Sequence, residues 1–252
     1  MNLSVNNISL LFITILVFIA IGISYKEKLG LEKEIIVSIC RAVIQLIIVG
    51  YLLKYIFRVN NIFLTMIMIF IILINAAYNA NKRSNGLEDG FWISFFSIFI
   101  STFITVGVLV MTQTIKFVPS QIIPITGMVA SNSMVAIGLC YRNMHSQFHD
   151  QREQVLEKLA LGATIKEASN SIIKASIKTG MSPTIDSAKT VGIVSLPGMM
   201  SGLIFAGIDP VYAIKYQIMV TFMLLSATSL GSFIASYYAY KKYYNSRKQL
   251  LS

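Results

Sequence analysis

The chain has 252 residues, of which 55% are hydrophobic and only 13% are charged. A soluble domain carries about twice that charged fraction, so the composition excludes an ordinary soluble enzyme or binding module. The net charge of +10 does not favour a nucleic-acid partner, because most basic residues fall in loops between apolar runs.

The apolar residues are clustered in runs of about 20, the length of a helix that crosses a bilayer. We therefore expect an all-α, polytopic membrane protein rather than a barrel of short alternating strands. No repeat or separate soluble domain is visible, which favours a single membrane domain over residues 1–252. Seven spans are expected, at residues 8–24, 35–56, 62–79, 91–114, 121–140, 190–207 and 211–238.

Three of these spans have features of their own. The first has no basic residue before Lys26, so it lacks the flanks of a cleaved signal peptide and is interpreted as a retained span. The fifth contains Pro124 and Gly127, and the sixth contains Pro197-Gly198. Because proline removes a helical hydrogen bond, both are expected to be short and interrupted.

The basic residues predict that the N-terminus lies outside the cell membrane and the C-terminus inside. With that orientation, sixteen Lys and Arg residues face the cytoplasm, four face outward, and Arg41 lies within a span. Such an excess on the cytoplasmic side is the rule for helical membrane proteins. The tyrosines beside Lys241-Lys242 are expected to mark the inner membrane boundary. They are Tyr237, Tyr238, Tyr240, Tyr243 and Tyr244.

Residues 141–189 form a charged, amphipathic run that predicts a cytoplasmic helical hairpin between spans five and six. The first helix is expected at about 144–161, with Gly162 ending it in a left-handed conformation. The second is expected to begin with a capping box between Thr164 and Glu167 and to end near Gly180 and Pro183.

The corner of this hairpin is compact enough to dock a partner and transmit force; the alternative is a hairpin that lies on lipid. The corner residues are Glu157, Leu159, Ala160, Leu161, Gly162, Ala163 and Thr164.

The corner resembles the coupling loop of ABC-transporter permeases, although its glycine follows Glu157 by five residues, where six are usual. Longer segments are more specific, and they identify the chain as similar to the FetB family of ABC permeases. These segments are Ile123–Met128, Asn132–Met134, Leu159–Thr164, Pro183–Gly192, Ser195–Gly202 and Ala206–Pro210.

The resemblance implies the membrane part of a transporter that pairs with a separate ATP-binding subunit. ATP and Mg²⁺ would then belong to that partner, and this chain would bind no cofactor and catalyse no reaction itself. Bacterial members of the family are linked to iron export, and plant relatives to aluminium tolerance. One copy has too few spans to enclose a path comfortably, which favours a homodimer in the inner membrane. The alternatives are a permease for a non-metal solute or a membrane assembly factor.

Polar residues in the expected spans are few. None of the eleven acidic residues falls at the centre of a span, which weighs against a proton- or sodium-coupled transporter. Arg41, with Gln45 on the same helix face, is interpreted as an anchor that reaches the inner surface. Alternatively, it pairs with Asn75, Asn79 or a backbone carbonyl and shapes the path. The amides of Asn75, Asn79 and Asn132 are interpreted as interhelical hydrogen-bonding groups, with substrate contact as the alternative.

Residues 197–202 are the candidate gate. Pro197 frees a backbone carbonyl, which is tolerable in a membrane only beside protein or a cavity. Gly198 and Gly202 give a face of small residues directly after that break, so we expect the segment to move when the partner moves.

Metal ligation is a weaker hypothesis. The thioether sulfur atoms of Met199 and Met200 are possible ligands for soft metal ions. Methionine is, however, also a common residue in apolar packing. His145 and His149 have the spacing of a pair of ligands on one helix face, yet a solvated surface is the favoured interpretation.

Overall fold

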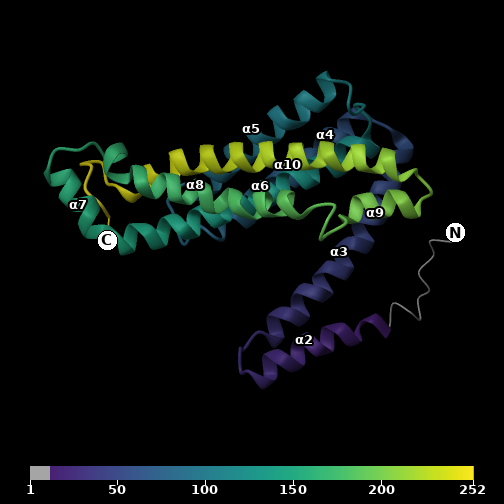
Figure 1. Cartoon of the computed structure of the whole chain (residues 1–252), viewed down its shortest axis with the longest axis horizontal. Helices are drawn as coiled ribbons and strands as arrows, with labels where there is room; N and C mark the ends of the chain where they lie inside the picture. The colour runs from purple at the N-terminus through teal and green to yellow at the C-terminus, as the bar shows by residue number, and fades with distance from the viewer. Residues whose placement is uncertain (1–11, 252) are drawn as a thin grey trace. The chain divides into compact units, whose positions relative to one another are not determined.

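The computed structural model describes residues 12–251, a chain that is 80% helical and has no strand within that range. It contains two compact units. Within the described residues, the first consists of 12–60 together with Phe205–Ile208, and the second consists of Asn61–Ile204 and 209–251. Figure 1 labels the helices.

The first unit is a helical hairpin of α2 (Ile15–Lys26) and α3 (Glu32–Val59). The hydroxyl of Ser24 donates to the Glu32 carboxylate at 2.7 Å and accepts from the backbone N–H of Leu31 at 3.2 Å. The Ser24 side chain therefore joins the end of α2 to the beginning of α3 across the turn. The helix α3 ends at Asn60, which adopts a left-handed conformation.

The second unit packs its helices around α6, with α8 and α10 beside it (Figure 1). The hydroxyl of Ser133 on α6 donates to the Ala227 carbonyl on α10 at 3.3 Å, and farther along Phe148 meets Tyr244, so α6 and α10 run in the same direction. The helix α8 runs in the opposite direction. The elements are α4 (Ile62–Asn81), α5 (Gly90–Met111), α6 (Pro119–Asp150), α7 (Arg152–Ala160), α8 (Ile165–Thr190), α9 (Gly198–Phe205), α10 (Pro210–Ala239) and η1 (Tyr240–Tyr243).

Within the described residues, five helices are long and apolar enough to cross a membrane: α3, α4, α5, α6, and α10 continued by η1. They match five of the seven expected spans, so a polytopic helical membrane protein is confirmed. The first expected span lies partly outside the described residues, and its described part corresponds to α2. The sixth, 190–207, is not one helix, because α8 ends at Thr190 and α9 begins only at Gly198.

Two predicted interruptions are wrong. The helix α6 continues through Pro124, whose side chain is exposed, and extends to Asp150. Similarly, α8 does not end at Gly180 and Pro183 but continues to Thr190. The expected hairpin helix at 144–161 is instead the end of α6 followed by the short α7, with a break at Gln151.

Gly180 explains why α8 is longer than expected. A Cβ atom at this position would lie 2.6 Å from Ser232 Oγ and 2.9 Å from the Ala136 carbonyl oxygen, and it would also collide with Cys140 Sγ. The missing side chain therefore allows α8 to approach α6 and α10 closely, rather than ending the helix. As a result, the second half of α8 packs against α6 and α10.

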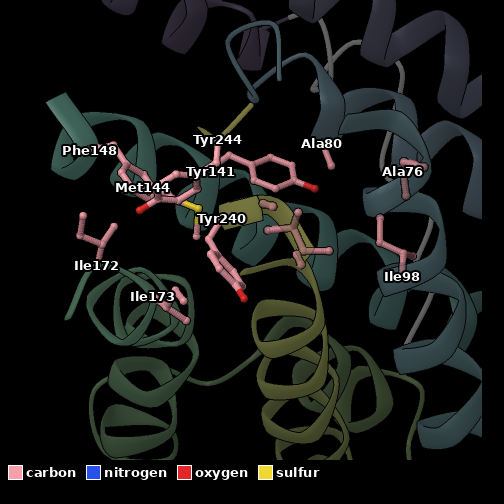
Figure 2. Packing of buried hydrophobic residues seen from close by; sticks show 14 of the residues in the cluster. Ala76, Ala80, Ile98, Tyr141, Met144, Phe148, Ile172, Ile173, Tyr240 and Tyr244 are labelled. Atoms are coloured by element: carbon pink, nitrogen blue, oxygen red, sulfur yellow. The ribbon is translucent and has the colours of Figure 1, made fainter. Parts of the chain in front are cut away.

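Figure 2 shows part of the main core of the second unit, around Tyr141 and Tyr240. Tyr141, Met144 and Phe148 of α6 meet Tyr240 and Tyr244 there. Both of these tyrosines are buried in the bundle, and their place at the inner membrane boundary stays a prediction. Tyr238 remains exposed, as expected for a boundary residue.

Candidate functional site

The predicted corner is present between α7 and α8, and we call residues 157–164 the elbow. Gly162 has φ +89°, a left-handed conformation that favours glycine. Its N–H donates to the Leu159 carbonyl at 3.0 Å, and the Ala163 N–H donates to the Lys158 carbonyl at 3.0 Å. These two bonds form a Schellman motif, so α7 ends in a defined turn.

The capping box at the start of α8 is confirmed. The Thr164 hydroxyl accepts from the Glu167 N–H at 3.3 Å, and a Glu167 carboxylate oxygen accepts from the Thr164 N–H at 2.8 Å. The same oxygen accepts from the Thr164 hydroxyl at 2.7 Å. The bonds from the Thr164 backbone and then its hydroxyl lower the pKa of Glu167. The elbow is therefore fixed on both sides by local hydrogen bonds.

The elbow is anchored on one side and exposed on the other. Val155 is buried, and Leu159 and Ile165 pack against the main core. Leu161, at the tip, is 88% exposed, and Glu157 is exposed beside it. An apolar side chain held outward on a stiff corner is suited to fill a pocket on another protein.

The C-terminal segment ties the elbow to the bundle, and we call residues 243–251 the C-terminal clamp. The Tyr244 hydroxyl forms a hydrogen bond of 2.6 Å with Ser169 of α8, and the Tyr243 ring stacks on Phe148 at 4.3 Å between centroids. The Arg152 guanidinium donates to the Leu251 carbonyl at 2.7 Å. Sequence reasoning missed this clamp, because its contacts join residues far apart in the chain.

We expect Tyr244→Phe to lower the free energy of unfolding by about 1 kcal/mol, because it leaves the buried Ser169 hydroxyl without its partner. Thermal unfolding of the purified protein in detergent measures the effect. Tyr238→Phe is the matched control, since Tyr238 is exposed. Equal melting temperatures for the two variants would contradict the prediction.

The candidate amides do not join helices in the described structure. The Asn79 side-chain N–H donates to the Asn75 carbonyl and side-chain oxygens, both at 2.8 Å, within α4. The Asn132 side chain donates to the Met128 carbonyl at 2.8 Å within α6. Arg41 and Gln45 lie on α3 of the first unit with exposed side chains. Their role in a path stays a prediction.

Small hydroxyl residues form the interhelical bonds instead. Ser94 on α5 bonds Tyr141 on α6 at 2.9 Å, and Ser101 bonds Ser133 at 3.3 Å. Hydrogen bonds of this kind between close-packed helices are common inside membranes. The regular spacing of serines along residues 94–101 is the sequence pattern that indicates these hydrogen bonds.

The expected break before α9 is present. Residues 191–197 are not helical; the Gly192 N–H donates to the Ser195 carbonyl at 2.9 Å, and Gly192 has φ +85°. A Cβ atom at either Gly198 or Gly202 would meet no atom within 4 Å. The neighbouring methionines diverge, since Met199 and Met200 line different cavities.

A cleft of about 380 Å³ lies at the end of the bundle that holds the clamp. It is bordered by His145 and His149, together with Arg152 and Lys242. Among residues 12–251, no group of three or more His, Cys, Asp or Glu side chains is placed to hold a metal ion. The histidine pair therefore gains no further ligand of these types from the fold.

Asp186 lies on the second half of α8, whose neighbouring residues Thr184 and Ser187 border a cavity with Asn132 of α6 and Leu224 of α10. Its carboxylate forms an ion pair of 2.9 Å with Lys189, and both side chains are exposed. Whether Asp186 lies within a membrane span stays a prediction.

The chain is similar to known membrane proteins along nearly its whole length. It is 57% identical to the "Probable iron export permease protein FetB" of Escherichia coli K12, over 98% of this chain and 96% of that protein. It is 34% identical to the "UPF0014 membrane protein STAR2" of rice, over 94% of this chain and 83% of that protein.

It is also 33% identical to the "Protein ALUMINUM SENSITIVE 3" of Arabidopsis thaliana, over 94% of this chain and 86% of that protein. No solved structure matches the chain. The family model described as "Uncharacterised protein family (UPF0014)" matches residues 7–244. The fold, the lengths of the helices and these similarities agree: the chain is a multi-pass membrane protein that belongs to the UPF0014 family.

Proposed function

We propose that this chain is the permease subunit of an ABC transporter that exports iron, with ATP hydrolysed by a separate subunit. The observation that carries the proposal is the elbow. It is a rigid corner with an exposed apolar tip, positioned by a Schellman motif and a capping box. The similarity to a relative named as a probable iron export permease supports the cargo.

The proposed topology has seven crossings, with the N-terminus outside and the C-terminus inside. The second half of α8, residues 191–197 and α9 together would form the sixth crossing. Many Lys and Arg residues lie at the elbow end of the second unit, in the α4–α5 loop, in α7 and in the C-terminal clamp. Because basic residues are more frequent on the cytoplasmic side, this favours the elbow end as cytoplasmic.

The mechanism we propose is alternating access in a permease homodimer. ATP-driven closure of two ATP-binding subunits would move the two elbows. Because the Ser169–Tyr244 bond and the Phe148–Tyr243 stack join the elbow end to α6, α8 and η1, that movement would reach the bundle as a unit. The non-helical residues 191–197 would accommodate it. ATP and Mg²⁺ would bind only the partner.

The test is the ATPase activity of the purified pair of subunits in nanodiscs, measured across a panel of metal ions and small solutes. We expect Fe²⁺ to stimulate hydrolysis and to accumulate in inside-out vesicles that contain the pair. Stimulation by a non-metal solute alone would favour the alternative cargo. No ATP-binding partner at all would favour an assembly factor.

We expect Gly198→Leu combined with Gly202→Leu to reduce export at least tenfold while the ATP-binding subunit still co-purifies. At both positions a Cβ atom would have no other atom within 4 Å, so the leucines do not clash within this conformation of the chain. The loss of export would therefore arise because the side chains block a movement of the segment or its contact with a second permease copy. Gly107→Leu, another open position on a helix, is the matched control. Normal export by the double variant would refute a role of this segment in gating.

A further inference from the structure

The second half of α8 lies beside the middle of α6 and α10. Its residues Thr184 and Ser187 border a cavity of about 120 Å³ together with Asn132 of α6 and Leu224 of α10. Both neighbours lie well inside long apolar helices, more than ten residues from the ends of α6 and α10. Because a bilayer core is about 30 Å thick, a helix turn at this level lies within it when α6 and α10 cross.

An exposed ion pair occupies this depth. The side chains of Asp186 and Lys189 are 67% and 69% exposed, and their charged atoms are 2.9 Å apart. With 3.6 residues per turn, both point away from the face of α8 that carries Gly180 and Thr184. Charged side chains that face hydrocarbon cost several kcal/mol, so we infer that this face meets water or protein rather than lipid.

The ion pair continues a hydrophilic stripe that begins near the elbow. Ser171, Lys174 and Lys178 are exposed on the same side of α8, and Ser182 follows them half-buried. Polar side chains therefore recur on this face from the elbow end to the ion pair, with the half-buried Ala175 and Ile185 between them. Directly after the pair the helix ends, and irregular backbone at membrane depth is tolerated only beside protein or a water-filled cavity.

Asp186 has no acidic neighbour at this level. The other acidic residues of the described second unit lie at its ends, in the α4–α5 loop, around α7 and the start of α8, or at Asp209 before α10. A carboxylate oxygen is a suitable ligand for a divalent first-row metal ion. In the absence of cargo, the Lys189 ammonium neutralises this carboxylate.

We propose that the outward face of α8 from Ser171 to Lys189 lines a water-filled path between two permease copies, and that the Asp186 carboxylate contacts the metal cation in that path. The arriving cation displaces the Lys189 ammonium, which returns when the cation leaves. The inference rests on the proposed function, because it takes the homodimer and the metal cargo from there.

The first test compares Asp186→Asn with Lys189→Gln in the purified complex with its ATP-binding subunit. We expect Asp186→Asn to raise the Fe²⁺ concentration for half-maximal ATPase stimulation at least tenfold. Lys189→Gln is expected to leave it unchanged or to lower it, because the competing ammonium is gone. A merely structural ion pair would give changes in the same direction for both variants, and that result, or no change in either, would overturn the proposal.

The second test measures access to water. In a Cys40→Ser background, in which the remaining Cys140 is buried, Thr190→Cys is labelled with a membrane-impermeant methanethiosulfonate reagent. The control is Phe103→Cys, an exposed position on α5. The hydrogen bond between Ser101 and Ser133 shows that this part of α5 lies beside the middle of α6. We expect labelling at Thr190→Cys to be at least tenfold faster. Equally slow labelling would overturn the water-filled path.

The two failures are distinguishable. If Fe²⁺ does not stimulate the unaltered complex, iron export fails as the function, while the labelling rates still decide whether the face of α8 is hydrated. If Fe²⁺ stimulates the unaltered complex but the labelling or the opposite shifts are missing, only the role of α8 and Asp186 fails.

Discussion

Gly180→Ala is expected to lower the free energy of unfolding by about 3 kcal/mol, at the upper end of the usual cost of overpacking. The new Cβ would lie 2.9 Å from the Ala136 carbonyl oxygen, a backbone atom that cannot move away without shifting α6. Gly180→Leu is expected to yield no folded protein. Thermal unfolding followed by size-exclusion chromatography in detergent measures both effects.

The matched control is Gly127→Ala, on α6. Gly127 also lies inside a helix, but a Cβ atom there would meet nothing within 4 Å. Alanine is the better helix former by about 0.5–1 kcal/mol, so this variant should be neutral or slightly more stable. If Gly180→Ala melts with the unaltered protein, the close approach of α8 to α6 and α10 is wrong.

Leu161→Asp is expected to abolish co-purification of the ATP-binding subunit and to reduce the ATPase activity of the complex at least tenfold. Leu161 is 88% exposed, so the substitution removes no contact within the chain and the melting temperature should not change. Burying a carboxylate in an apolar pocket of the partner, in contrast, would cost several kcal/mol.

Leu161→Met tests whether size and apolarity are sufficient, since methionine fills a similar volume. This variant should keep the partner bound. Wild-type co-purification by Leu161→Asp, with an unchanged melting temperature, would show that the tip of the elbow is not the contact.

The features that sequence reasoning predicted are those that depend on local chemistry. Long apolar runs predict membrane helices because length and apolarity alone decide them. The capping box at Thr164 and Glu167 and the glycine turn at Gly162 use only neighbours in the chain. The elbow was therefore available from the sequence with its boundaries nearly correct.

The length of α8 was not available in the same way. Gly180 and Pro183 end helices when no tertiary contact opposes them, but here Gly180 fits against Cys140 and Ser232. The polar composition of α8 also hid its position in the bundle, because average hydropathy does not record which face is packed. A signal did exist: Ser169, Ser176 and Gly180 place small residues on one face at helical spacing.

The predicted end of α8 near Gly180 and Pro183 also affected the prediction of the candidate site. Local patterns give no sign that Asp186 and Lys189 lie on a helix that packs against α6 and α10. The burial of the tyrosines could not be predicted for the same reason, because Tyr244 forms its hydrogen bond with Ser169, a residue far away in the sequence. Contacts of this kind depend on topology, which local patterns do not determine.

The C-terminal clamp has a genetic consequence. Tyr244 pairs with Leu250 in a short backbone bridge, and both side chains are buried, so this segment belongs to the packed structure. A stop codon placed just after Tyr243 would expose Ser169 and free Arg152 from the Leu251 carbonyl. Loss of these residues should therefore weaken the attachment of the elbow to the bundle.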